Sequence, residues 1–124
     1  MRLLLDTHAL IWWTGAPDKL KPVAREAIAG ADHVAVSAAC LWEVAVKTAA
    51  GKLRPPDGLV DELADMGLEP LAVTAGHVWH TRTLPLHHGD PVDRLLVAQA
   101  QLEGFTVVTR DPHIPRYAVS VLPA

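Results

Sequence analysis

Short apolar runs alternate along the chain with longer segments in which apolar residues recur at helical spacing. Runs of consecutive apolar residues predict buried strands, and they cover residues 2–5, 34–36, 71–73, 105–109 and 119–122. The run at 105–109 is the strongest of these predictions. It is aromatic and β-branched, and it lies between Gly104 and Asp111.

Amphipathic spacing between these runs predicts helices over residues 7–14, 19–29, 38–50, 59–66, 75–83 and 91–103. Several of these segments are followed by glycine, a common helix stop: Gly30, Gly51 and Gly104. Buried strands that alternate with helices predict an α/β fold with a parallel sheet. A chain of 124 residues fits one domain over residues 1–124.

Acidic residues stand where the predicted strands end. Asp6 directly follows the first strand, Asp111 follows the strand at 105–109, and Asp93 opens the helix that leads into that strand. Ligands of parallel α/β sheets bind beyond the carboxyl ends of the strands. Carboxylates that converge there repel one another unless a cation joins them. Mg²⁺ prefers oxygen ligands and binds phosphate oxygens, so this pattern favours chemistry on a phosphodiester.

Each of these acids also has an ordinary structural interpretation. Asp6 and Asp111 can cap the segments that follow them, and Asp90 precedes a proline in the arrangement typical of a helix N-cap. Asp93 can compensate the helix dipole or complete a capping box with Asp90. The metal hypothesis therefore rests on the acids taken together.

Glu43 lies within an apolar helical segment, where it can pair with Lys47 one turn later. Taken alone, this surface pair is the favoured interpretation of Glu43. Lys47, Arg94 and Arg110 are candidate phosphate contacts because they stand near the acids. A structural salt bridge or a solvated helix end is the more usual role for such residues.

Composition restricts the function further. The formal net charge is −3, so binding a polyanion through overall charge is excluded, and a nucleic-acid substrate requires metal ions or a local basic patch. The single cysteine, Cys40, cannot form an internal disulfide, which predicts a reducing cytoplasm. No apolar run reaches the length of a membrane span, about 20 residues.

Four short motifs, in this order, resemble those of PIN-domain nucleases, and most closely the toxin subunit of VapBC-type toxin–antitoxin pairs. They are Leu3-Leu4-Leu5-Asp6-Thr7-His8, Trp42-Glu43, Asp90-Pro91-Val92-Asp93-Arg94-Leu95-Leu96 and Val108-Thr109-Arg110-Asp111. Each motif is weak alone, but the four together span nearly the whole chain.

This resemblance implies helices on both faces of the sheet, Mg²⁺ or Mn²⁺ as cofactor, and endoribonuclease activity. It implies a homodimer and an antitoxin partner that occludes the site. The family's acidic residues match Asp6, Glu43, Asp93 and Asp111, with Thr109 and Asp90 as accessory residues. Asp6, Asp93 and Asp111 are expected to hold the metal, with Glu43 binding it directly or through water. A metal-activated water would then hydrolyse RNA.

The histidines and tryptophans leave other interpretations open. A zinc site built from His77, His80, His87 and His88 is conceivable, but Cys40 has no partner and the spacing is loose for zinc. Trp12 and Trp13 are adjacent, so one helix cannot bury both against the same surface. One of them is expected to meet a second subunit or a partner helix.

Two rival functions remain. One is an aspartate-based phosphatase, but Asp6-Thr7-His8 lacks the second aspartate, two residues on, that haloacid-type phosphatases use. The other is a catalytically silent module with this fold that binds RNA or protein. The complete acidic set argues against it.

Overall fold

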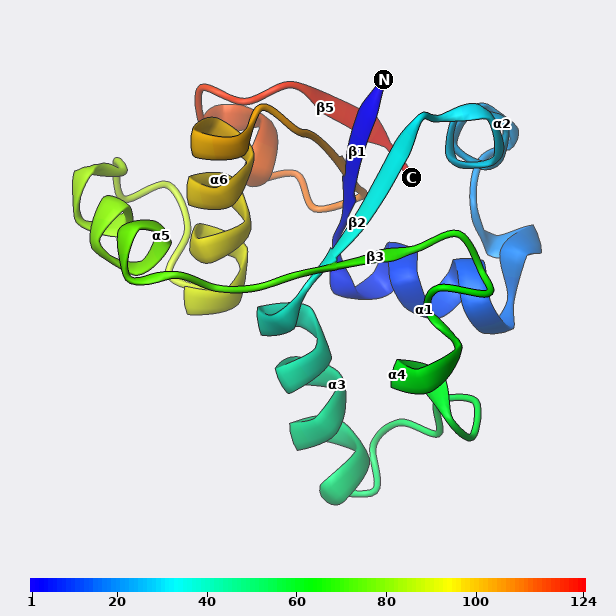
Figure 1. Cartoon of the computed structure of the whole chain (residues 1–124). Helices are drawn as coiled ribbons and strands as arrows, with labels where there is room; N and C mark the ends of the chain where they lie inside the picture. The colour runs from blue at the N-terminus through cyan, green and yellow to red at the C-terminus, as the bar shows by residue number, and fades with distance from the viewer.

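The computed structural model describes residues 1–124 and contains one five-stranded sheet, in which every pair of neighbouring strands is parallel (Figure 1). The strands are β1 (Arg2–Leu5), β2 (His33–Ser37), β3 (Glu69–Leu71), β4 (Thr106–Thr109) and β5 (Val121–Pro123). Their order across the sheet is β3-β2-β1-β4-β5, which places β1 and β4 side by side near its centre. The predicted α/β fold with a parallel sheet is confirmed.

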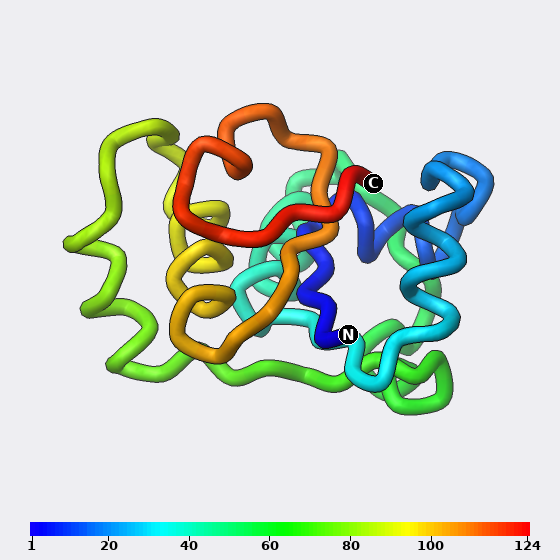
Figure 2. The backbone as a smooth tube through the Cα atoms, turned by 90° about the horizontal axis from the view of Figure 1, so that it is seen from above, coloured from blue at the N-terminus to red at the C-terminus, as the bar shows by residue number.

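Helices cover both faces of this sheet. They are α1 (Thr7–Gly15), α2 (Pro22–Gly30), α3 (Ala38–Ala49), α4 (Leu59–Glu62), α5 (Ala75–His80) and α6 (Pro91–Glu103). Figures 1 and 2 show α1 and α2 on one side of the sheet and α5 and α6 on the other. Three short 3₁₀ turns complete the chain: η1 (Pro17–Lys19), η2 (Thr81–Thr83) and η3 (Ile114–Arg116). None of the helices combines the length and apolarity needed to cross a lipid bilayer.

Strand β1 explains why the core has two halves. Successive side chains of a strand point to opposite faces of the sheet. Leu3 and Leu5 therefore pack in the cluster that contains residues of α1 and α2, whereas Leu4 packs in the cluster that contains much of α6. All three leucines are fully buried. A strand covered on both faces needs consecutive apolar residues, which is the pattern that the sequence shows.

Some element boundaries differ from the sequence predictions. Strand β3 lies at Glu69–Leu71, not at 71–73, because its position is set by pairing with residues of β2 at the edge of the sheet. The helix expected from residue 19 begins at Pro22, since proline is favoured in the first turn, and a 3₁₀ turn precedes it. Helix α4 is shorter than expected and ends at Glu62.

Candidate metal centre

The topology brings the predicted acids to one end of the sheet. Asp6 follows β1 and Asp111 lies two residues after β4, the neighbouring parallel strand. Asp93 lies in the first turn of α6, and Glu43 projects from α3, the helix that follows β2. These four side chains line one cavity of about 510 Å³, the metal-centre cavity. The convergence that the sequence argument required is therefore present.

Asp6 is both a helix cap and a wall of this cavity. Its Oδ1 accepts a hydrogen bond from the Ala9 amide at 2.8 Å, which caps α1. Its Oδ2 accepts one from the Thr109 hydroxyl at 2.5 Å. Burial raises the pKa of Asp6 and the nearby charge of Asp111 adds to the rise, whereas these two hydrogen bonds and His8 oppose it. The carboxylate that caps α1 therefore also lines the metal-centre cavity.

Thr109 connects two of the acids. Besides donating to Asp6, its hydroxyl oxygen accepts a hydrogen bond from the backbone amide of Asp111 at 3.0 Å. Thr109 is itself buried at the end of β4. A single hydroxyl therefore fixes the Asp6 carboxylate relative to the turn that carries Asp111.

Asp93 and Asp111 face each other across His88. The Nε2 atom of His88 lies 2.8 Å from Asp93 Oδ2 and 3.1 Å from Asp111 Oδ2. Burial, followed by the charges of Asp90 and Asp111, raises the pKa of Asp93 to about 7, and His88 opposes this rise. Burial alone would raise the pKa of Asp111. The hydrogen bond from the His113 amide, together with the charge and hydrogen bond of His88, outweighs burial and brings the pKa below its ordinary value.

Asp90 serves the helix that carries Asp93. Its Oδ1 accepts a hydrogen bond from the Asp93 amide at 3.0 Å, so Asp90 is the N-cap of α6, with Pro91 in the first turn. Its side chain also lines the metal-centre cavity. Asp90 therefore combines a structural function with an effect on the charge of Asp93.

Glu43 pairs with Lys47 one helical turn away, at 3.5 Å between Oε2 and Nζ. Both residues line the cavity as well. The acidic site also affects the pKa of the buried Cys40 thiol, which lies on the same helix. Its pKa is raised to about 12, first by burial and then by the charges of Asp6, Glu43 and Asp93. The surface pair expected from sequence thus forms at the wall of the acidic site.

Residues 3–120 match the family model of the PIN domain. The chain belongs to the PIN domain family. It is 34% identical over 116 residues to Ribonuclease VapC22 of Mycobacterium tuberculosis, a match that covers 88% of this chain and 86% of that protein. The resemblance inferred from the four motifs is confirmed.

Solved structures show the same fold as this PIN domain. VapBC2 from Rickettsia felis, bound to a promoter DNA fragment, matches with a TM-score of 0.73 and 18% identity, over 98% of each chain. DNA-bound VapBC from Salmonella typhimurium matches with a TM-score of 0.69 and 18% identity, over 98% of this chain and 97% of that one. A toxin–antitoxin complex from Klebsiella pneumoniae matches with a TM-score of 0.66 and 18% identity, over 98% of this chain and 96% of that one.

The donor set of this PIN domain fits a divalent cation. One ligand atom each from His88, Asp93 and Asp111 lie within 4.8 Å of one another. Asp6 and Glu43 line the same cavity and add carboxylate oxygens. A bound cation would relieve the repulsion that contributes to the raised pKa of Asp6 and Asp93. Carboxylates in this number are the oxygen ligands that hard divalent cations prefer.

Arg94 does not reach this cavity, and its predicted phosphate contact is corrected. Its guanidinium donates to the carbonyl oxygens of Thr81, Pro85 and Leu84 at 2.9, 2.8 and 3.3 Å, and to the Tyr117 hydroxyl at 3.3 Å. Consecutive residues of a helix point to different faces. Proximity to Asp93 in sequence therefore does not bring Arg94 to the site; it fastens the loop before α6.

Arg110 and Lys47 do line the metal-centre cavity. The Arg110 guanidinium donates to the carbonyl oxygens of Lys19 and Ala124, each at 2.7 Å from Nη2, and stacks 4.4 Å from the centre of the Trp12 ring. Its hydrogen-bonding capacity is thus largely used within the protein. Lys47 has one carboxylate partner, so it is the freer of the two for contact with a phosphate.

Sequence reasoning underestimated His88. It treated this residue as one of four histidines for a zinc site, and that set does not assemble. His77 contacts Glu103 at 2.9 Å and His80 contacts Gln101 at 2.7 Å, on the outer side of α6. The available signal was position: His88 lies two residues before the cap of the helix that carries Asp93.

Proposed function

We propose that this PIN domain is a metal-dependent endoribonuclease and the toxin of a type II toxin–antitoxin system. The observation that supports this most is the single cavity that gathers Asp6, Glu43, Asp93 and Asp111. Similarity to Ribonuclease VapC22 over most of both chains supports RNA as the substrate. Because the cavity is lined mainly by polar side chains, it suits a phosphodiester better than an apolar ligand.

We assign the metal to Asp6, Asp93 and Asp111, with Glu43 binding it directly or through water, and we propose Mg²⁺ or Mn²⁺ as the ion. When bound, such an ion activates water and stabilises the charge that develops on the phosphate. Thr109 keeps the Asp6 carboxylate oriented, and Asp90 keeps the first turn of α6 in place. Lys47 provides positive charge at the edge of the cavity, where an RNA backbone would enter.

The test is cleavage of RNA by the purified protein with Mg²⁺ or Mn²⁺. We compare the intact chain with Asp6→Asn and with Asp18→Asn, which alters a carboxylate that is fully exposed. The intact chain and Asp18→Asn should cut RNA and leave 5′-phosphate and 3′-hydroxyl ends, because water attacks the phosphorus and the 3′-oxygen is the leaving group. Asp6→Asn should lose at least about 100-fold in rate, as expected when a transition-state interaction is removed.

Three outcomes would contradict the proposal. Products with a cyclic phosphate would mean that the ribose 2′-hydroxyl attacks instead of water. Full activity in excess chelator would mean that the acids do not act through a metal. An Asp6→Asn protein that cuts as fast as Asp18→Asn would support a different active site.

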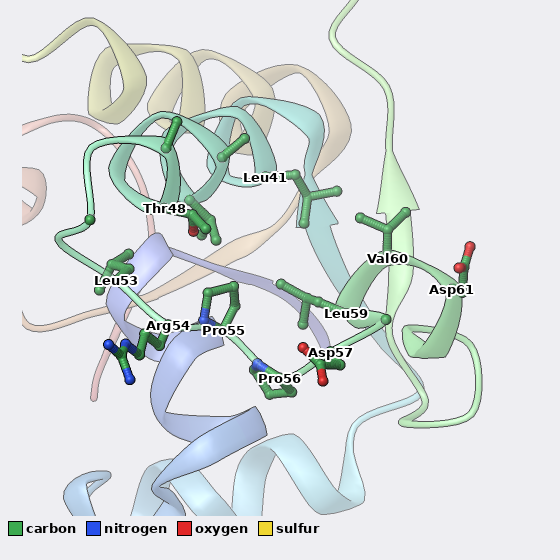
Figure 3. A pocket seen from close by; sticks show the side chains of 15 residues that line it. Leu41, Thr48, Leu53, Arg54, Pro55, Pro56, Asp57, Leu59, Val60 and Asp61 are labelled. Atoms are coloured by element: carbon green, nitrogen blue, oxygen red, sulfur yellow. The ribbon is translucent and has the colours of Figure 1, made fainter.

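The proposed antitoxin would use an apolar groove beside the metal centre. A cavity of about 920 Å³ is lined by side chains from α3, from the loop that follows it and from α4 (Figure 3). A second cavity of about 310 Å³ shares residues 53–56 with it, and shares His8 and Trp12 with the metal-centre cavity. Because these spaces adjoin, a partner segment in the groove would reach the acids and occlude them.

The toxin–antitoxin complex from Klebsiella pneumoniae has this fold, which supports the choice of an antitoxin as partner. We also propose a homodimer, as the family resemblance implied. The cytoplasm is the proposed compartment, since RNA substrate is found there and Cys40, the single cysteine, is a free thiol.

A further inference from the structure

His88 points its imidazole into the acidic cavity, not toward solvent. Its Nε2 is 2.8 Å from Asp93 Oδ2 and 3.1 Å from Asp111 Oδ2. The side chains of His88, Asp93 and Asp111 are 21%, 22% and 24% exposed, so all three lie at the same depth in the wall. One nitrogen and two carboxylate oxygens thus approach a common point, within 4.8 Å of one another.

The loop around His88 is held in place by contacts with residues other than Asp93 and Asp111. The His88 amide donates to the Tyr117 hydroxyl at 2.9 Å, and that hydroxyl also receives a hydrogen bond from Arg94 at 3.3 Å. Tyr117 is buried. The His88 ring packs against His113, with 4.7 Å between ring centres. These contacts position the imidazole before any ligand binds, as expected of a binding group.

We infer that His88 is a nitrogen ligand of the metal centre and shifts its preference from Mg²⁺ toward first-row transition cations such as Mn²⁺. This inference rests on the proposed function, because it assumes a metal among the same acids. Mg²⁺ strongly favours an all-oxygen shell and keeps several waters. Imidazole nitrogen suits transition cations better, so adding His88 to Asp93 and Asp111 favours them selectively.

The alternative is that the imidazole only separates two carboxylates and must leave when a metal arrives. The two roles predict opposite effects of His88→Ala. Loss of a ligand weakens Mn²⁺ binding, whereas loss of a blocking group strengthens the binding of every divalent cation. The comparison of Mn²⁺ with Mg²⁺ therefore separates the two roles without any RNA present.

The first measurement is a titration of the full chain with Mn²⁺, followed by the electron paramagnetic resonance of the free ion, and with Mg²⁺ by calorimetry. His88→Ala should weaken Mn²⁺ binding by at least about 10-fold, because even the loss of a group that only orients a metal ligand costs that much. Its effect on Mg²⁺ should be several times smaller, so the Mn²⁺/Mg²⁺ preference falls. The matched control is His33→Ala, which removes another imidazole with a carboxylate neighbour, Glu69 at 3.1 Å. It should change neither affinity.

The second measurement detects the ligand nitrogen directly. Electron spin echo modulation of the Mn²⁺-loaded intact protein should show a directly bound ¹⁴N nucleus, and the signal should be absent in His88→Ala and retained in His33→Ala. A nitrogen-free spectrum of the intact protein overturns the inference, as does a His88→Ala protein that binds Mn²⁺ as tightly as the intact chain. A protein that shows the nitrogen signal yet never cuts RNA would instead refute the proposed function and leave the ligand assignment intact.

Discussion

At the scale of single residues, Asp93 lies where burial and neighbouring negative charges both oppose its ionisation. Its carboxylate is partly buried, lies near the charges of Asp90 and Asp111, and has a pKa raised to about 7. Folding the metal-free chain therefore opposes ionisation of Asp93. A site whose ligands disfavour their own charge is stabilised when a cation binds, and this links function to an energetic cost in the metal-free protein.

Replacing this residue should separate catalysis from stability. We expect Asp93→Asn to abolish RNA cleavage while leaving the metal-free protein equally or more stable at neutral pH, because the variant removes a disfavoured charge. Chemical denaturation in chelator measures the free energy of unfolding. Substantial unfolding of Asp93→Asn would show that the carboxylate is needed for the helix start instead.

The sign of the pH dependence follows from the same shift. The folded-state pKa of Asp93 lies above the unfolded value of 3.8, so its stabilising contribution is complete below about pH 4 and is lost as pH rises through about 7. The unfolding free energy of the intact chain should therefore fall relative to Asp93→Asn across that window. The lowered pKa of Asp111 acts in the opposite direction, and at more acidic pH.

The sequence predicted the acids but not the histidine among them. Asp6 and Asp111 follow apolar runs, and the carboxyl ends of parallel strands must meet at one edge of the sheet, so their convergence follows from local patterns. The approach of His88 depends on a loop held by Tyr117 and Arg94, which are distant in sequence from one another. Its position two residues before the Asp90 cap places His88 near Asp93 in the chain, but does not show that the imidazole turns toward the acids.

At the scale of elements, helix α6 is the most strongly specified part of the chain. It begins with an Asp90 cap and Pro91, and it is followed by Gly104, whose positive φ of 75° suits glycine. All of these signals are local, and the predicted bounds of α6 were correct. The edge strand β3 is the opposite case: its residues are largely exposed, and pairing with β2 determines its position.

Asp90 caps α6 and also raises the pKa of Asp93, and two substitutions separate these effects. Asp90→Ser keeps a side-chain oxygen for the Asp93 amide but removes the charge, whereas Asp90→Ala removes both. We expect Asp90→Ala to lose about 1 kcal/mol of unfolding free energy and Asp90→Ser to lose much less. Both variants should lower the pKa of Asp93, measured by NMR titration of its carboxyl carbon. Equal stability of the two variants would argue against the capping role.

At the scale of the whole molecule, the metal centre joins segments from nearly the full length of the chain. β1 and β4 pair at the middle of the sheet, and Arg110 connects the turn after β4 to Lys19 and to Ala124. A cation that binds only the folded state should therefore stabilise the entire fold.

We expect Mn²⁺ or Mg²⁺ to raise the thermal midpoint of the intact chain and excess chelator to reverse the rise. At a free concentration 100 times the dissociation constant, the gain is about 2.7 kcal/mol. Scanning calorimetry measures it, with Asp6→Asn as the variant that should respond far less. An equal shift for both proteins would place the cation elsewhere.

The pairing of β1 with β4 also has a consequence for how the protein emerges during synthesis. A ribosome that has made the first hundred residues has produced Asp6, Glu43 and Asp93, but neither the neighbouring central strand nor Asp111. Such an unfinished chain has only part of the constellation and no complete sheet to hold it. The chain would therefore become able to cut RNA only when its translation is almost over, once β4 and Asp111 have been made.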